Sequence, residues 1–214
     1  MIDSSFFIQY GPQLLWACVT TLKIAFFGTL LGFTGGTLLA LGQRSHIPIL
    51  VQIINAYVTV VRGTPMVVQI TFYYYALNLP FPPVVIFILA IGANSAAYIS
   101  QIIKAGIQSV DKGQIEAAFI LGLTKMQTTR YIILPQAIKV VLPALGNEFA
   151  TLIKDSSLAY MIGVNELFKE GRNIMSNTYD VMSVYLAITL LYLVMTYCVT
   201  FYVEKLEKKW GQTC

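Results

Sequence analysis

Four polar side chains interrupt or border stretches of sequence that are otherwise apolar: Arg62, Asn94, Glu148 and Asp155. A charged group in apolar surroundings needs an opposite charge, a hydrogen bond or water, because its removal from water is costly. Such residues therefore usually face a polar cavity or a partner. One guanidinium, one amide and two carboxylates could together bind a solute that carries charges of both signs. We take these four residues as candidates to line a polar pathway.

Structural roles are open for the same residues. Arg62 could contact the end of a neighbouring helix, and Glu148 could form a structural pair with Lys139 or with Arg62. Asp155 follows Lys154 directly, so these two could form a solvated ion pair at the edge of an apolar run. The sequence alone does not choose between these roles and a role in a pathway.

The sequence contains no recognisable catalytic or metal-binding pattern. The single histidine, His46, has no serine or cysteine placed beside it as a nucleophile. Cys18, Cys198 and Cys214 do not have the spacing of metal ligands. No Gly-x-x-x-x-Gly-Lys-Ser/Thr phosphate loop occurs, so the chain cannot bind ATP by that device. We predict no catalytic residues, no metal site and no enzymatic activity in this chain by itself.

Composition indicates an integral membrane protein. Of the 214 residues, 57% are hydrophobic and only 11% are charged, whereas about 25% of the residues of soluble domains are charged. Lipid offers the backbone no hydrogen-bond partners, so a membrane span must be a helix or part of a closed barrel. The long apolar runs lack the alternation of barrel strands. We predict an all-α fold that forms a single transmembrane domain over residues 1–214.

The apolar runs predict about five transmembrane helices, which cover residues 14–41, 49–77, 84–103, 132–153 and 181–203. In the first run, Gly28 and Gly32 form a small-xxx-small face that favours close helix packing. In the second run, Pro65 removes an amide donor and Gly63 relaxes the backbone. We therefore expect a kink or an unwound turn there.

Basic residues gather on one side of this arrangement. That side, with its margin, carries Arg44, Lys104, Lys112, Lys125, Arg130, Lys139, Lys205, Lys208 and Lys209, and the other side carries Lys154, Lys169 and Arg172. The positive-inside rule then places the loops at residues 43–48 and 109–131 in the cytoplasm, with the N-terminus outside and the C-terminus inside. Outside, we expect an aromatic interfacial anchor at residues 1–13 and a short surface helix within 166–180.

The second of these loops has the pattern of two short helices joined by a turn. Asp111 or Ser109 can cap the first helix, and Gln114 has the capping-box offset from Asp111. Gly122 suits the position after a helix end, and Pro135 is expected to interrupt the second helix. A DNA-binding helix-turn-helix has a similar outline. The apolar flanks favour a membrane protein, and no nucleic-acid partner is expected.

The same loop contains a motif of small and apolar residues with one acid, formed by Glu116, Ala117, Ala118, Gly122, Ile132, Leu134 and Pro135. Its spacing resembles the cytoplasmic loop of permease subunits of ATP-binding-cassette (ABC) importers. The resemblance implies a coupling helix that sits in a groove on a separate ATPase subunit. Ala117, Ala118 and Gly122 would let the partner approach closely, and Glu116 offers a charge for orientation. An ordinary interhelical hairpin is the structural alternative.

Three further segments, at residues 62–65, 94–98 and 152–158, resemble permeases of the polar amino-acid uptake family, whose substrates include histidine, glutamate, glutamine, arginine and opines. The resemblance implies an importer of a polar amino acid in the bacterial cytoplasmic (inner) membrane, with the pathway formed by a homodimer or by a heterodimer with a similar permease. It further implies ATPase subunits, which would bind ATP and magnesium, and an extracytoplasmic solute-binding protein. No cofactor is expected in this chain.

Asn94, Tyr98 and Gln101 share one helix face, because they stand at positions i, i+4 and i+7. We expect this face to point into the bundle or into a wet pathway. The amino-acid permeases would have an acidic residue where this chain has Gln101, and that departure leaves the role of Gln101 open.

An ion-driven secondary amino-acid transporter, with Glu148 as its proton or sodium site, is the alternative. Such folds usually contain paired inverted repeats. The chain shows no second copy of the segment at residues 62–65 or of the motif at 116–118. The ATP-driven importer is therefore favoured, with the identity of the amino acid and of the second permease left open.

Overall fold

The computed structural model describes residues 4–211, and every regular element in this range is a helix. Cys214 and the first three residues lie outside it. Four helices are long and apolar enough to cross a membrane, and a bent pair of helices supplies a fifth span if it is counted as one. The predicted all-α membrane fold is confirmed.

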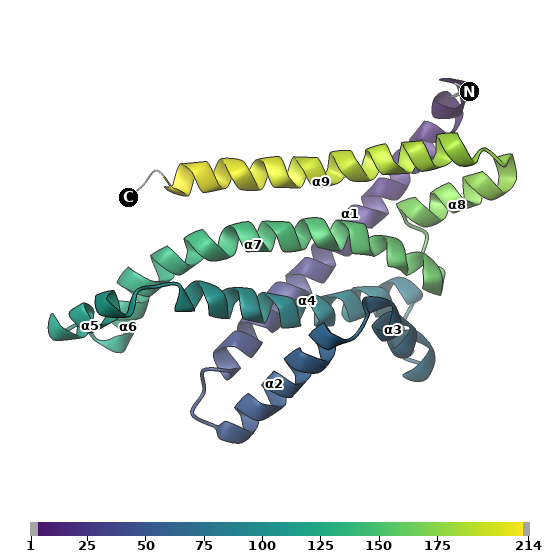
Figure 1. The fold of residues 1–214 in the computed structure, drawn as a ribbon. Coiled ribbons are helices and arrows are strands. Elements are labelled where there is room, and N and C mark those ends of the chain that lie inside the picture. The colour runs from purple at the N-terminus through teal and green to yellow at the C-terminus, as the bar shows by residue number, and fades with distance from the viewer. Residues whose placement is uncertain (1–3, 212–214) are drawn as a thin grey trace.

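The helices follow in the order α1 (Ser4–Gly42), α2 (Pro48–Gly63), α3 (Met66–Thr71), η1 (Phe72–Ala76), α4 (Pro83–Gln108), α5 (Lys112–Ile120), α6 (Lys125–Thr128), η2 (Thr129–Ile133), α7 (Leu134–Asp155), η3 (Ser156–Ile162), α8 (Leu167–Thr178) and α9 (Val181–Gly211). In Figure 1, α5, α6 and the end of α9 lie toward the left, and α3, α8 and the N-terminus lie toward the right. We call these the α5 end and the α8 end.

Helices α1 and α4 approach each other closely because glycine lines their contact. A Cβ atom built on Gly32 would lie 2.7 Å from the Ser95 Cβ atom, and one on Gly36 would lie 2.8 Å from the Ile99 Cβ atom. Real side-chain atoms cannot come this near, so residues with larger side chains would separate the two helices. The predicted close packing at Gly28 and Gly32 is confirmed, since a Cβ atom on Gly28 would meet Ile91 at 2.8 Å.

The second span is broken, as its proline and glycine predict. Helix α2 ends at Gly63, Thr64 and Pro65 are extended, and α3 begins at Met66. The two parts meet at a bend of 109°. This change of direction is far larger than a kink, because two consecutive residues leave the helical conformation and the first helical turn of α3 starts afresh.

Two sequence-based expectations are wrong. The aromatic segment before the first span is no separate anchor but the first turns of α1, because buried Phe6 packs with Leu14 and Leu167. Pro135 does not interrupt the helix that follows α5. A helix longer than the predicted span begins at Lys125 and continues through π-helical η2 into α7, where Pro135 occupies the first turn. A wide π-type turn lets a helix continue past a position that lacks an amide donor.

A buried carboxylate, Glu166, joins the parts of the α8 end. It caps α8 by accepting hydrogen bonds from the backbone N–H groups of Phe168 at 2.9 Å and Lys169 at 2.8 Å. The hydroxyl of Tyr192 on α9 donates a third hydrogen bond at 2.9 Å. Burial raises the pKa of the Glu166 carboxyl to about 7, although these hydrogen bonds act in the opposite direction. The predicted surface helix within 166–180 is thus present as α8, with one face buried.

The raised pKa of Glu166 predicts that stability falls as pH rises toward neutrality. Between the ordinary pKa of 4.5 and the folded-state value of about 7, the folded chain holds a proton that the unfolded chain releases. The stabilisation is complete below about pH 4.5 and is lost as pH rises through 7, by roughly 3 kcal/mol. We expect a lower thermal midpoint of unfolding in detergent at pH 8 than at pH 5. Glu166→Gln, which has no proton to lose, should show a smaller decrease, and an equal decrease in both proteins would contradict this account.

Candidate functional site

A polar cavity of about 320 Å³ lies between the break in the second span, α4 and α7. Its lining consists of Thr64, Met66, Ile91, Asn94, Tyr98, Glu148, Thr151, Leu152 and Asp155. Three of the four residues predicted for a polar pathway are therefore brought to one place, from segments that are far apart in the sequence. Their contact with a transported solute stays a prediction.

The charge of the cavity comes from two carboxylates on one face of α7. Glu148 and Asp155 are seven residues apart, which is close to two helical turns, and Thr151 lies between them on the same face. The Ser95 hydroxyl of α4 donates a hydrogen bond to Glu148 Oε1 at 2.8 Å. The partner of Glu148 is thus a buried hydroxyl, which orients the carboxyl group without supplying an opposite charge. Among the residues that the structure describes, no basic side chain lines this cavity.

Arg62 lies beside the cavity and not in its wall. It belongs to the last turn of α2, and its guanidinium carbon lies 5.3 Å from the centre of the Tyr98 ring. A guanidinium over an aromatic face is attracted by the negative charge of the ring face. Because Tyr98 lines the cavity, this contact holds a positive group beside the α4 wall of the cavity.

Gln69 is a residue of the site that the sequence analysis missed. Its amide nitrogen donates hydrogen bonds to the carbonyl oxygens of Val61 at 2.8 Å and Thr64 at 3.1 Å. Its amide oxygen accepts one from Asn94 Nδ2 at 2.9 Å. Backbone groups that a helix break frees must find partners inside a membrane. Gln69 supplies them and ties the break to the wall of the cavity. An amide one turn after Pro65, between apolar neighbours, was the available signal.

Asn94, Tyr98 and Gln101 share one face of α4, but their side chains lie in two different parts of the structure. Asn94 and Tyr98 line the cavity. Gln101 lies nearer the α5 end, where its amide nitrogen donates to the Gln43 amide oxygen at 3.3 Å. Gln43 in turn donates to Asn55 Oδ1 at 3.1 Å. Gln101 therefore helps to join α4 to the end of α1 and the middle of α2.

The predicted coupling loop forms a capped hairpin at the α5 end. The Asp111 carboxylate caps α5 by accepting a hydrogen bond from the Gly113 N–H at 2.8 Å. Gly122 ends the turn after α5 with φ +80°, a conformation that favours glycine. Gln114 accepts a hydrogen bond from Gln136 Nε2 at 2.7 Å instead of closing a capping box. The helix, its Asp111 cap and its glycine end are as predicted.

The four predicted coupling residues do not all face outward. Glu116, Ala117 and Gly122 are exposed, whereas Ala118 is buried inside the hairpin and offers no surface to a partner. Large apolar side chains at the tip of the hairpin are exposed instead, with Ile120 at 87%, Leu121 at 78% and Met126 at 79%. Such a group of exposed apolar side chains on a loop is typical of a protein or membrane contact surface. The coupling role itself stays a prediction.

The hairpin is connected directly to two walls of the cavity. Its first leg continues α4, which carries Asn94 and Tyr98, and its second leg continues into α7, which carries Glu148 and Asp155. Figure 1 shows α4 and α7 running from the hairpin toward the α8 end. A displacement of the hairpin would therefore act on α7 through continuous helix and on α4 through the short connection at residues 109–111.

Comparison with known proteins matches residues 28–212 to the family described as "Binding-protein-dependent transport system inner membrane component". The chain is 38% identical over 201 residues to the probable amino-acid permease protein YxeN of Bacillus subtilis (strain 168), covering 91% of this chain and 90% of the relative. It is 34% identical over 221 residues to the glutamine transport system permease protein GlnP of Escherichia coli (strain K12), covering 94% and 98%.

Solved structures have the same fold. A chain of an amino acid ABC transporter crystallised with histidines superposes with a TM-score of 0.92 at 36% identity, covering 98% of this chain and 99% of that chain. A chain of the MetNI methionine ABC transporter in an inward-facing conformation gives a TM-score of 0.73 at 20% identity, covering 97% and 99%. The second comparison supports the fold alone.

Gln69 is expected to be essential for the stability of the broken span. Gln69→Leu removes the partner of two backbone carbonyls and of Asn94, in contacts that are half-buried or exposed, so the loss should lie toward the lower end of the about 1–3 kcal/mol that an unpartnered buried polar group costs. The thermal midpoint of the purified chain should fall by several degrees. Gln52→Leu, at an exposed position of α2, serves as the matched control and should leave the midpoint within about one degree. Equal midpoints in the two variants would show that Gln69 does not hold the break together.

Proposed function

The chain belongs to the family of binding-protein-dependent transport system inner membrane components, and we propose that it is the permease subunit of an ATP-driven importer for polar amino acids. The resemblance stated from the sequence is thereby confirmed at the level of the family. The names of the relatives, an amino-acid permease and a glutamine transport permease, support the class of substrate. The observation that carries the proposal is the cavity with two carboxylates whose walls, α4 and α7, are joined by the hairpin.

An amino acid suits this cavity because the site can supply a partner for each of its charges. The carboxylates of Glu148 and Asp155 would bind the ammonium group, and Arg62 beside Tyr98 would bind the carboxylate group. Each ion is then paired in low dielectric, as its transfer out of water requires. The Asn94 amide would serve polar side chains. Two carboxylates exceed the charge of one ammonium, so a cationic side chain should be favoured.

The chain contributes one half of a dimeric pathway in this proposal. Five helices enclose little space, and a second permease, identical or similar, would complete the route for the solute. ATPase subunits would hold ATP and magnesium and would bind the exposed tip of the hairpin. Their movement would pass through α5 into α4 and α7 and would change access to the cavity, as a rigid-body transition between two states.

The orientation follows the distribution of basic residues. The α5 end would face the cytoplasm and the ATPase subunits, and the α8 end would face outward, where a solute-binding protein delivers the substrate. The ion-driven alternative gains no support, because the solved structure at 36% identity belongs to an amino acid ABC transporter.

Loss of one cavity carboxylate should impair transport. Glu148→Gln keeps the size and the hydrogen bond from Ser95 but removes one negative charge, so uptake of labelled arginine or glutamine into proteoliposomes should fall at least about tenfold. Glu207→Gln, an exposed position near the end of α9, is the control and should transport normally. Assembly with the partner subunits should be unchanged in both. Normal uptake by Glu148→Gln would remove this residue from the pathway.

The coupling role of the hairpin is tested at Gly122. A Cβ atom on Gly122 has no other atom within 4 Å, but its φ of +80° strains most side chains. Asparagine tolerates this conformation, so a Gly122→Asn variant separates the effect of backbone strain from the effect of side-chain bulk. When the chain is purified from membranes, Gly122→Trp should lose the co-purifying ATPase or its substrate-stimulated ATP hydrolysis, and Gly122→Asn should largely retain both. The coupling proposal fails if no ATPase accompanies the intact chain, or if tryptophan has no effect.

A further inference from the structure

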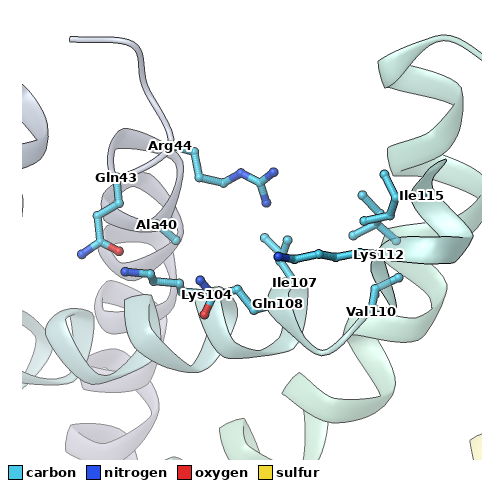
Figure 2. Close-up of a pocket in the computed structure, with 10 residues that line it drawn as sticks. Ala40, Gln43, Arg44, Lys104, Ile107, Gln108, Val110, Lys112 and Ile115 are labelled. Carbon is cyan, nitrogen blue, oxygen red and sulfur yellow. The ribbon is translucent and has the colours of Figure 1, made fainter. Parts of the chain in front are cut away.

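A second cavity, of about 510 Å³, lies at the α5 end and is basic. Figure 2 shows Arg44, from the turn after α1, and Lys112, from the start of α5, pointing toward one another across it, with Lys104 on α4. The three positive groups come from three different elements. The fold therefore brings them together, and they do not form a run of basic sequence.

Nothing on the described part of the chain neutralises these three charges. No carboxylate lines the cavity. The nearest acid in sequence, Asp111, uses its carboxylate to cap α5 through the Gly113 N–H. Within residues 4–211, the side chains of Arg44, Lys104 and Lys112 have no hydrogen bond or ion pair. Three uncompensated positive charges around one space repel each other and favour a bound anion.

The position of the cavity and the residues that line it indicate which kind of anion fits. The span that contains α1 ends at Gly42, two residues before Arg44, and the span that contains α4 ends at Gln108. The cavity therefore lies where apolar helices meet water. Apart from the basic and amide side chains, its lining is aliphatic and includes Ile107, Ile115 and Ile133. A phosphate that carries apolar chains satisfies both parts of this lining, whereas a free phosphate satisfies only the charged part.

We propose that this cavity binds the phosphate group of an anionic phospholipid from the cytoplasmic leaflet. Basic pockets between membrane helices on the cytoplasmic side recognise such head groups. Arg44 suits the recognition of phosphate because its guanidinium offers parallel donors, and the two lysines add point charges. The proposal rests on the orientation proposed above, and its test does not depend on transport or on ATP hydrolysis.

A bound lipid would connect the hairpin to the bundle. Lys112 and Ile115 belong to α5, whereas Arg44 and Lys104 belong to the α1–α2 turn and to α4. One phosphate contacting Arg44 and Lys112 would hold the first turn of α5 against the end of α1, with Lys104 adding positive charge from α4. Lipid composition would thereby set how freely the hairpin moves.

The test measures lipid binding to the transporter purified with its partners in detergent. Native mass spectrometry gives the dissociation constant of dioctanoyl phosphatidylglycerol, with dioctanoyl phosphatidylcholine and inorganic phosphate as comparison ligands. The double variant Lys104→Gln, Lys112→Gln removes two charges from the cavity. The matched control Lys205→Gln, Lys208→Gln removes two exposed charges from α9 at the same end of the molecule. Thermal midpoints without lipid establish that both variants are folded.

We expect the cavity variant to bind phosphatidylglycerol at least about tenfold more weakly and the control to stay within about twofold. Phosphatidylcholine should bind weakly to all three proteins, and inorganic phosphate should not displace phosphatidylglycerol. Equal weakening in both variants would overturn the proposal, because attraction would then be a general property of the surface. Displacement by inorganic phosphate would reject a lipid as the source of the anion. Loss of a partner subunit from the cavity variant, with lipid binding unchanged, would identify the cavity as a protein contact.

Discussion

The close contact between α1 and α4 determines where the polar groups of the cavity can lie. It depends on positions without side chains, since a Cβ atom on Gly32 would meet Ser95 at 2.7 Å. Ser95 is buried against this glycine, and its hydroxyl donates a hydrogen bond to Glu148. Packing between two helices is thus transmitted to a carboxylate on a third. Replacement of the glycine face would shift α4 and, with it, the partner that orients Glu148.

The second constraint is the satisfaction of backbone groups where the second span breaks. An irregular backbone is tolerated at membrane depth only where protein or water supplies hydrogen bonds. Here one amide side chain, Gln69, serves two carbonyls of the break and one amide of α4. The break brings Thr64 to the cavity. An element that costs stability is thereby used to build part of the cavity wall.

Local chemistry explains which features could be predicted from the sequence. The helical class follows from composition, the break from Gly63 and Pro65, and the bounds of α5 from an acidic cap and a terminal glycine. Each of these depends on a few adjacent residues. Pro135 was misjudged because its effect depends on the preceding turn, and that turn widens to a π-helix. Phe6 was misjudged because its burial depends on α8 and α9, more than 150 residues away.

The residues of the candidate site could be predicted from the sequence, but the hydrogen bonds and contacts between them could not. Arg62, Asn94, Glu148 and Asp155 stand out because polar groups are rare in apolar runs. The pairing of Gln69 with Asn94 requires the bend of 109°, and no periodicity reveals it. The basic cavity at the α5 end could not be predicted from the sequence either. Its residues were counted only as members of a positively charged side, because their convergence depends on how three helix ends meet.

The exposed tip of the hairpin also affects the life of the chain before assembly. Ile120, Leu121 and Met126 stand in water on a surface loop, where apolar groups attract chaperones, proteases and other copies of the chain. A subunit made in excess of its partners would present this tip continuously, whereas an assembled one would cover it. In the proposed assembly, the surface that binds the ATPase subunits would thus also distinguish orphan chains from assembled chains, and it would link the abundance of the permease to the supply of its partners.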